Sequence, residues 1–152
     1  DPTICEILLK AHFEQGADYT TAKNAAVGTN LEIINVSALR KVKAYFKSAD
    51  YSEYMTWYFQ NNPEFFNLQF IDLPPELVRS YRLTLDYEED LQLFNAIDQH
   101  FKSKGKSTYS LIEIFEYLDA HPEISSINKD CQLKYKTDQT LIDLLNEKTK
   151  MK

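Results

Sequence analysis

Apolar residues in this chain switch repeatedly between the spacing of a helix and the alternating spacing of a strand. The first segment opens with Asp1-Pro2-Thr3, which is typical of a helix start, and its apolar residues keep helical spacing until Gly16. The β-prone segments are residues 18–21, 31–36, 67–73 and 81–85. Helical patterns lie between and after them, and this alternation predicts an α/β fold with helices packed on a sheet.

Polar residues indicate where the later helices begin. Ser37 is a candidate N-cap for a second helix, and residues 51–59, 111–118 and 140–148 show further helical patterns. Asp86-Tyr87-Glu88-Glu89 matches a capping box, in which Asp86 accepts from the N3 amide and Glu89 reaches back. The helix behind this box carries its apolar stripe on Leu91, Phe94, Ile97 and Phe101.

Composition and charge exclude several classes of protein. The chain has 152 residues, enough for one domain, and its ten Tyr and nine Phe predict a core built largely from aromatic rings. Lys and Arg number 17 against 23 Asp and Glu, and a net charge of -6 disfavours binding to nucleic acid. The sequence shows no apolar run of membrane-spanning length and no signal segment, so we predict a cytoplasmic protein that does not bind membranes.

Phosphate-binding motifs are missing from the sequence. A doubly wound nucleotide-binding domain normally begins with a strand and a glycine-rich turn, and this chain has neither pattern. His12, His100 and His121 are far apart in sequence and do not show metal-ligand spacing. Either the fold does not bind nucleotides, or the part that binds them is not in this chain.

Two carboxylates are candidates for chemistry. Asp86 follows the β-prone segment 81–85, and ligands of α/β sheets bind beyond the carboxyl ends of strands, where a hard oxygen ligand suits Mg²⁺. Glu32 stands at the start of a strand that follows the Gly28 turn, where it can meet a sugar hydroxyl. Each residue also has a plainer interpretation, Asp86 as an N-cap and no more, and Glu32 as a solvent-facing residue of an edge strand.

Several short motifs are more specific in their order and spacing than any of them is alone. They are Gly16-Ala17-Asp18-Tyr19, Gly28 to Ile34, Ala38-Leu39, Asn62-Pro63-Glu64-Phe65-Phe66, Arg82 to Leu91, His121-Pro122-Glu123-Ile124 and Ile127-Asn128. In this order they resemble the C-terminal part of the cytidylyltransferase family, which includes the spore-coat-polysaccharide type enzymes and the synthetases of CMP-activated acidic sugars. The family pattern is not matched at Val27, Asn30, 52–54 and Glu88, positions that bear on sugar contacts and leave Asp86 in place.

The resemblance implies the C-terminal part of a Rossmann-like nucleotidyltransferase sheet with flanking helices and without its opening strands. Residues 1–102 would form a partial nucleotidyltransferase α/β domain, and residues 103–152 a helical C-terminal extension of the same domain. Members of this family use Mg²⁺ to transfer CMP from CTP to an acidic or polysaccharide-precursor sugar. By match to their motifs, Asp86 would be a metal ligand, and Glu32 and Arg82 would bind substrate.

The resemblance also implies that the partner carboxylate and the basic phosphate-binding loop belong to a first half that would precede Asp1. We therefore expect a fragment that is inactive alone, and whose incomplete sheet exposes an edge for self-association or a swapped homodimer. The alternative is a non-catalytic α/β protein-interaction module that binds its partner through an exposed aromatic helix at residues 51–59.

Overall fold

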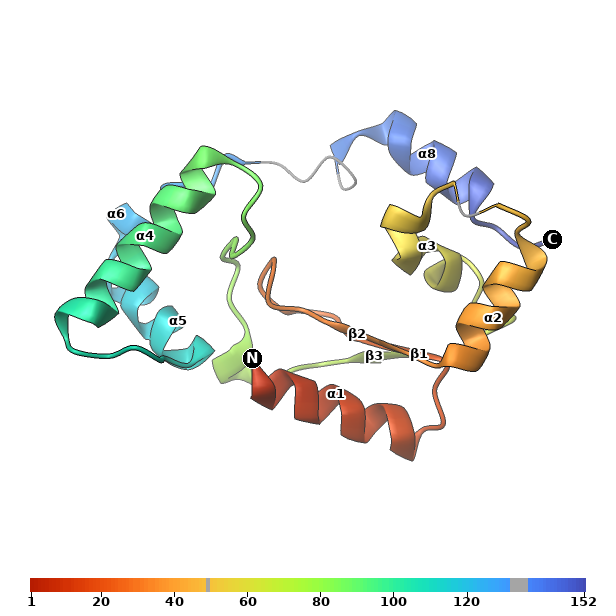
Figure 1. The fold of residues 1–152 in the computed structure, drawn as a ribbon, viewed down its shortest axis with the longest axis horizontal. Coiled ribbons are helices and arrows are strands. Elements are labelled where there is room, and N and C mark those ends of the chain that lie inside the picture. Colours follow the sequence, from red (N-terminus) through yellow and green to blue (C-terminus); the bar gives the residue numbers. More distant parts are fainter. Residues whose placement is uncertain (49, 132–136) are drawn as a thin grey trace. The chain divides into compact units, whose positions relative to one another are not determined.

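Three short strands form the sheet of this computed structural model, which describes residues 1–48, 50–131 and 137–152. They are β1 (Tyr19–Ala22), β2 (Glu32–Ile34) and β3 (Leu68–Ile71), in the spatial order β2-β1-β3. β1 is central and fully buried, and it pairs antiparallel with β2 so that Tyr19 faces Ile34 and Thr21 faces Glu32 in the register. The predicted α/β fold is confirmed (Figure 1).

The chain divides into two units, each built from segments that are distant in sequence. Unit 1 comprises Asp1–Cys5, Ala22–Leu31 and Asp72–Cys131, and unit 2 comprises Glu6–Thr21, Glu32–Ile71 and the described part of Gln132–Lys152. The predicted division into a partial nucleotidyltransferase domain, residues 1–102, and its helical extension, residues 103–152, is not tested by these units and stays a prediction.

Aromatic side chains form much of the core of unit 2, as predicted. Tyr19 and Phe59 are fully buried and stack with their ring centroids 5.5 Å apart, and Phe59 meets Phe66 edge to face. The helices that contribute to this core are α2 (Val36–Tyr45) and α3 (Met55–Gln60), and a 3₁₀ turn, Ser52–Tyr54, precedes α3. The chain after α8 (Gln139–Lys148) adds Met151 to the same core.

The expected exposed aromatic helix at residues 51–59 is therefore wrong. Tyr58 and Phe59 of α3 are 2% and 0% exposed, and Tyr51 and Met55 pack against the same core. Their rings are used for folding because burial of each one removes a large apolar surface from water. The described structure gives an interaction module no exposed aromatic helix at this position.

Unit 1 is largely helical. It contains α4 (Glu88–Ser103), α5 (Leu111–Ala120) and α6 (Pro122–Ser125), of which α6 packs against both of the others (Figure 1). A 3₁₀ turn, Pro75–Leu77, contacts α5. The buried side chains of α4 and α5 are Asp90, Leu93, Ile97, Phe101, Leu111, Phe115 and Leu118. Within the described ranges, no helix is both long and apolar enough to cross a membrane.

The first helix forms as predicted. α1 (Pro2–Glu14) begins where the Asp1 side chain accepts a hydrogen bond from the amide of Thr3 at 2.8 Å, and Ile4 and Leu8 are fully buried. Gly16 follows with φ of 55°, the left-handed conformation in which a helix commonly ends. The apolar stripe stops earlier than predicted, because Phe13 is 74% exposed.

Several predicted element boundaries are wrong. Residues 81–85 do not form a strand, because Arg82 makes only a single parallel bridge, to Val27, and β2 is shorter and more exposed than the predicted buried strand 31–36. α2 begins after Asn35 instead of at Ser37. α4 begins at Glu88, and its buried face is shifted from the predicted stripe, leaving Leu91 48% exposed.

Candidate functional site

A buried ion pair between Arg82 and Asp90 lies at the start of α4, next to Asp86, the predicted metal ligand. The Arg82 side chain is 7% exposed and that of Asp90 is 0% exposed. Arg82 donates from Nε to Asp90 Oδ1 and from Nη2 to Asp90 Oδ2, both at 2.9 Å, which is the bidentate geometry that makes such pairs strong. The Arg82 guanidinium holds the pKa of the Asp90 carboxyl well below its usual range.

The Asp90 carboxylate accepts three further hydrogen bonds. Its Oδ2 accepts from the backbone amides of Asp86 and Tyr87 at 2.9 and 3.0 Å, and its Oδ1 accepts from Asn128 Nδ2 at 2.7 Å. Asn128 Nδ2 also donates to the Arg82 carbonyl oxygen at 3.0 Å. The predicted capping box of Asp86 and Glu89 is therefore wrong by one position, because Asp90 is the residue that reaches back to the helix start.

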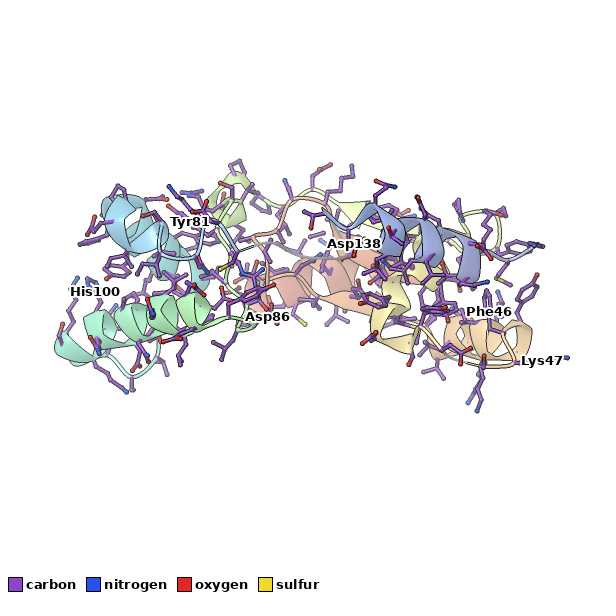
Figure 2. The ribbon with its side chains drawn as sticks, turned by 90° about the horizontal axis from the view of Figure 1, so that it is seen from above. Phe46, Lys47, Tyr81, Asp86, His100 and Asp138 are labelled. Atoms are coloured by element: carbon purple, nitrogen blue, oxygen red, sulfur yellow. The ribbon has the colours of Figure 1, made fainter. Side chains whose placement is uncertain are left out.

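Asp86 does not cap α4, because Tyr87 is the N-cap residue and Asp90 completes the capping box. Asp86 lies at the N-terminal end of α4 (Figure 2), and its side chain is 55% exposed. Arg82 Nη2 and Thr84 Oγ1 donate to Asp86 Oδ2 at 2.8 and 3.2 Å. Within the described part of the chain, Asp86 Oδ1 receives no hydrogen bond, so one oxygen is left to face a ligand.

The residues present fit one ligand of a magnesium ion. Mg²⁺ prefers hard oxygen ligands and is commonly held by one or two carboxylates together with substrate phosphates. Asp86 offers one such carboxylate oxygen. No group of three His, Cys, Asp or Glu side chains among the described residues could enclose an ion without such phosphates.

Arg82 itself is committed to these carboxylates. Its Nε and Nη2 are both hydrogen-bonded to aspartates, its guanidinium lies 5.2 Å from the centre of the Tyr87 ring, and its Nη1 is buried without a hydrogen-bond partner in the described structure. The geometry gives Arg82 a clear role in placing Asp86. Its predicted contact with substrate stays a prediction, and the nitrogen that has no hydrogen-bond partner in the described structure, Nη1, is buried.

The Gly28 turn fixes the segment that carries Arg82. The Val27 amide donates to Tyr81 O at 3.0 Å and the Leu83 amide donates to Val27 O at 2.6 Å. Gly28 has φ of 89°, and a Cβ at this position would lie 1.9 Å from the Leu83 carbonyl oxygen. Only glycine allows this close approach of two backbone segments.

A cavity of about 700 Å³ opens beside the same turn in unit 1. Its lining includes Gly28, Asn30, Leu83, Phe94 and Tyr109. This volume and mixture of apolar and polar walls are within the range of small-molecule sites. The cavity was not predicted from the sequence, because its walls come from segments that are far apart along the chain.

Glu32 belongs to unit 2, where it is part of a polar cluster with Tyr19, Thr56 and Gln60. Glu32 Oε1 accepts from the Tyr19 hydroxyl at 2.8 Å and from the Thr56 hydroxyl, and Gln60 Nε2 donates to the Tyr19 hydroxyl at 3.0 Å. Burial, and then the neighbouring Glu32 carboxylate, raise the pKa of Tyr19 above its usual range, so Tyr19 is a neutral donor.

The structure thus brings two of the three predicted site residues together, Arg82 and Asp86, and places Glu32 in the other unit. Sequence analysis missed the roles of Asp90 and Asn128, although both lie within motifs that carry the resemblance. The acidic run after Arg82 was the available signal for Asp90. Nothing local in the sequence indicates that Tyr19, Thr56 and Gln60 surround Glu32.

The fold matches about half of a solved cytidylyltransferase. A solved cytidylyltransferase structure from Leptospira borgpetersenii serovar Hardjo-bovis (strain JB197) superposes with a TM-score of 0.69 at 24% identity, covering 82% of this chain and 53% of that protein. No model of a known protein family matches the sequence.

In sequence, the chain is homologous to the spore coat polysaccharide biosynthesis protein SpsF of Bacillus subtilis (strain 168), with 31% identity over 128 residues. It is 31% identical over 130 residues to an uncharacterized protein of Methanocaldococcus jannaschii. These matches cover 83% and 85% of this chain, and 52% and 51% of the two relatives, so the chain spans about half their length. The predicted resemblance is confirmed, and the coverage agrees with a C-terminal part.

Proposed function

We propose that this chain is part of a nucleotidyltransferase that transfers CMP from CTP to a sugar. In this reaction a sugar hydroxyl oxygen bonds to the α-phosphorus of CTP, the bond from that phosphorus to the bridging oxygen breaks, and pyrophosphate leaves. The sugar hydroxyl loses its proton as the new bond forms. The homology to SpsF over 83% of the chain is the observation that carries this proposal.

Asp86 is the proposed magnesium ligand of this reaction. Asp86 would hold the ion, and the chemistry that Mg²⁺ would supply when bound is neutralisation of charge on the phosphates. The chain's own contribution is positioning, because Asp90 holds the Arg82 guanidinium and Asn128 holds Asp90 and the Arg82 carbonyl oxygen. The guanidinium in turn holds Asp86 Oδ2, and no described residue donates to Oδ1 of this half-exposed side chain. The proposed substrate-side groups are Glu32, toward the sugar, and Arg82.

We further propose that the residues of this chain are not sufficient for catalysis by themselves. One carboxylate binds Mg²⁺ weakly in the absence of phosphates, and no phosphate-binding loop is recognisable in the sequence. We expect the purified 152-residue chain to bind Mg²⁺ in the millimolar range or more weakly and to show no turnover of CTP.

The test is a pyrophosphate-release assay on the full-length protein that carries this sequence, with Mg²⁺, CTP and a panel of acidic and neutral sugars. We expect release that depends on a sugar, and a kcat for Asp86→Asn lower by about ten- to a hundredfold or more, because loss of a group that only supports a metal ligand already costs about ten- to a hundredfold. Asp72→Asn is the matched control, because Asp72 is an exposed aspartate of the same unit, paired with Lys23.

Two outcomes would contradict the proposal. The first is a wild-type protein that releases no pyrophosphate with any sugar of the panel, and the second is an Asp86→Asn protein as active as Asp72→Asn. Turnover of CTP by the 152-residue chain alone would contradict the proposal that it is an incomplete enzyme.

A further inference from the structure

The polar cluster around Glu32 has a defined direction of hydrogen bonding. Gln60 Nε2 donates to the Tyr19 hydroxyl, so that hydroxyl oxygen already acts as an acceptor and its own proton points to Glu32 Oε1. The Thr56 hydroxyl donates to the same Glu32 oxygen. Oε1 is therefore saturated by two donors of the protein, and the described structure gives Oε2 none.

The donors that hold Glu32 are themselves fixed by the fold. Tyr19 is 0% exposed, lies in the central strand β1 and stacks on Phe59. Thr56 and Gln60 lie four residues apart on α3, and therefore on one face of that helix. Glu32 is the exposed first residue of the edge strand β2, and no described residue donates to its second oxygen.

The charge of the cluster limits what Glu32 can bind. None of the ion pairs among the described residues includes Glu32, and the two side chains that donate to it, Tyr19 and Thr56, are neutral. A carboxylate oxygen in such a setting accepts hydrogen bonds from hydroxyl groups and repels a carboxylate or phosphate at close range.

We infer that Tyr19, Thr56 and Gln60 are positioning residues that hold Glu32 as an acceptor for the hydroxyl groups of a neutral sugar face. This inference rests on the proposed function and narrows its substrate. The part of the sugar that meets Glu32 carries hydroxyl donors, and an acidic group of the sugar, where there is one, does not bind at this residue.

The kinetic test uses the full-length protein with its best neutral sugar. Thr56→Val and Tyr19→Phe each remove one donor to Glu32, and each should raise the KM for the sugar about three- to tenfold, the range for one hydrogen bond. The KM for CTP and kcat should stay unchanged. Thr56→Ser keeps the hydroxyl and should restore the wild-type KM.

Tyr45→Phe is the matched control, because it removes a tyrosine hydroxyl of the same unit that bonds only the backbone of Lys152. Its KM for the sugar should equal that of the wild type. The inference is overturned if Thr56→Val and Tyr19→Phe behave like Tyr45→Phe, or if they change the KM for CTP by the same factor. An active wild-type protein with either result leaves the proposed function standing.

A binding measurement decides the inference even if the full-length protein is inactive. The ¹⁵N-labelled 152-residue chain is titrated by NMR with methyl α-D-glucopyranoside and, separately, with its 6-carboxylate analogue. We expect the neutral glycoside to shift the amides of residues 19, 32 and 56, and Glu32→Gln to weaken these shifts. Equal shifts from the acidic analogue, or no shifts from the neutral one, would overturn the inference.

Discussion

Asp86 and Asp90 are one helical turn apart in sequence, and their environments give them different roles. Asp90 is fully buried and accepts from Arg82 in bidentate geometry and from three further donors. Asp86 is half exposed and accepts a single hydrogen bond from the same arginine, through Nη2. A buried ion pair of this kind tolerates the loss of a partner poorly, because the remaining charge stays desolvated. Asp90 is therefore structural, and Asp86 is available for chemistry.

Replacing Asp90 by Asn should lower the free energy of unfolding at pH 7 by about 3–5 kcal/mol, because the Arg82 charge loses its buried partner. Chemical denaturation followed by circular dichroism measures this loss. Asp98→Asn is the control, since Asp98 forms an exposed pair with Lys102 and should cost less than about 1 kcal/mol. Equal stability of the two variants would contradict the structural role of Asp90.

The same pair predicts a pH dependence. Because the pKa of Asp90 is lower in the folded than in the unfolded protein, its contribution is fully present above the unfolded-state pKa of about 3.9. It is lost as the pH falls from there through the depressed folded-state pKa. We expect the wild-type unfolding free energy to drop below pH 4 more steeply than that of Asp90→Asn, and parallel curves would contradict this.

Gly28→Ala should destabilise the protein by about 3 kcal/mol, because it combines a positive φ with a collision against the Leu83 backbone. Gly105→Ala is the matched control, with φ of 72° and open space at its Cβ, and it should cost about 1 kcal/mol. Thermal melting distinguishes the two. A Gly28→Ala protein as stable as Gly105→Ala would contradict the close approach.

For individual residues, the sequence indicates which side chains are candidates for the site better than it indicates which side chains they contact. It indicates Asp86 and Glu32 as candidates from their places after a strand pattern and a glycine turn. It cannot separate Asp86 from Asp90, because both are acidic residues near a helix start and only burial distinguishes them. Thr56, which donates to Glu32, and Gln60, which donates to the Tyr19 hydroxyl, reach the cluster through the packing of α3, which no local pattern encodes.

Among the elements, helices were predicted more accurately than strands. α1 and α5 carry their own signals, a capping residue before them and a Gly or Pro after them, within one local segment. A strand depends on a neighbour supplied by distant sequence, and the segment 81–85 finds only the single bridge of Arg82 to Val27. The β-prone residues of this segment predict a strand, but they carry no information on whether a neighbouring strand is present to pair with it.

The last helix depends on a buried asparagine. Asn62 is 0% exposed, its Nδ2 donates to Tyr58 O and Thr149 O at 2.8 Å, and its Oδ1 accepts from the Met151 amide at 2.7 Å. These bonds hold the chain that follows α8 against α3 and the residues after it, within unit 2. Sequence analysis predicted this helix and not its anchor.

Asn62→Ala should lower the free energy of unfolding by about 3 kcal/mol, because it leaves buried backbone groups of Thr149 and Met151 without partners. It should also remove the hydrogen-exchange protection of the amides of α8 first. Asn95→Ala, on the exposed face of α4, is the control and should change neither. Unchanged protection of α8 in Asn62→Ala would contradict the anchoring role.

For the whole molecule, the small sheet predicts self-association. In the order β2-β1-β3, two of the three described strands lie at edges, and β2 has an exposed first residue. Open edges pair with other chains. We expect sedimentation velocity of the 152-residue chain to show a concentration-dependent dimer, and a monomer at all concentrations would contradict this.

If Asp86 offers a ligand to a divalent ion, the ion binds beside it, and the site of binding can be located by NMR. Mn²⁺ added to the ¹⁵N-labelled chain broadens the resonances of nearby amides. We expect broadening centred on residues 84–87 at millimolar Mn²⁺, lost in Asp86→Asn and kept in Asp72→Asn. Broadening centred on another acidic segment, or unchanged in Asp86→Asn, would contradict it.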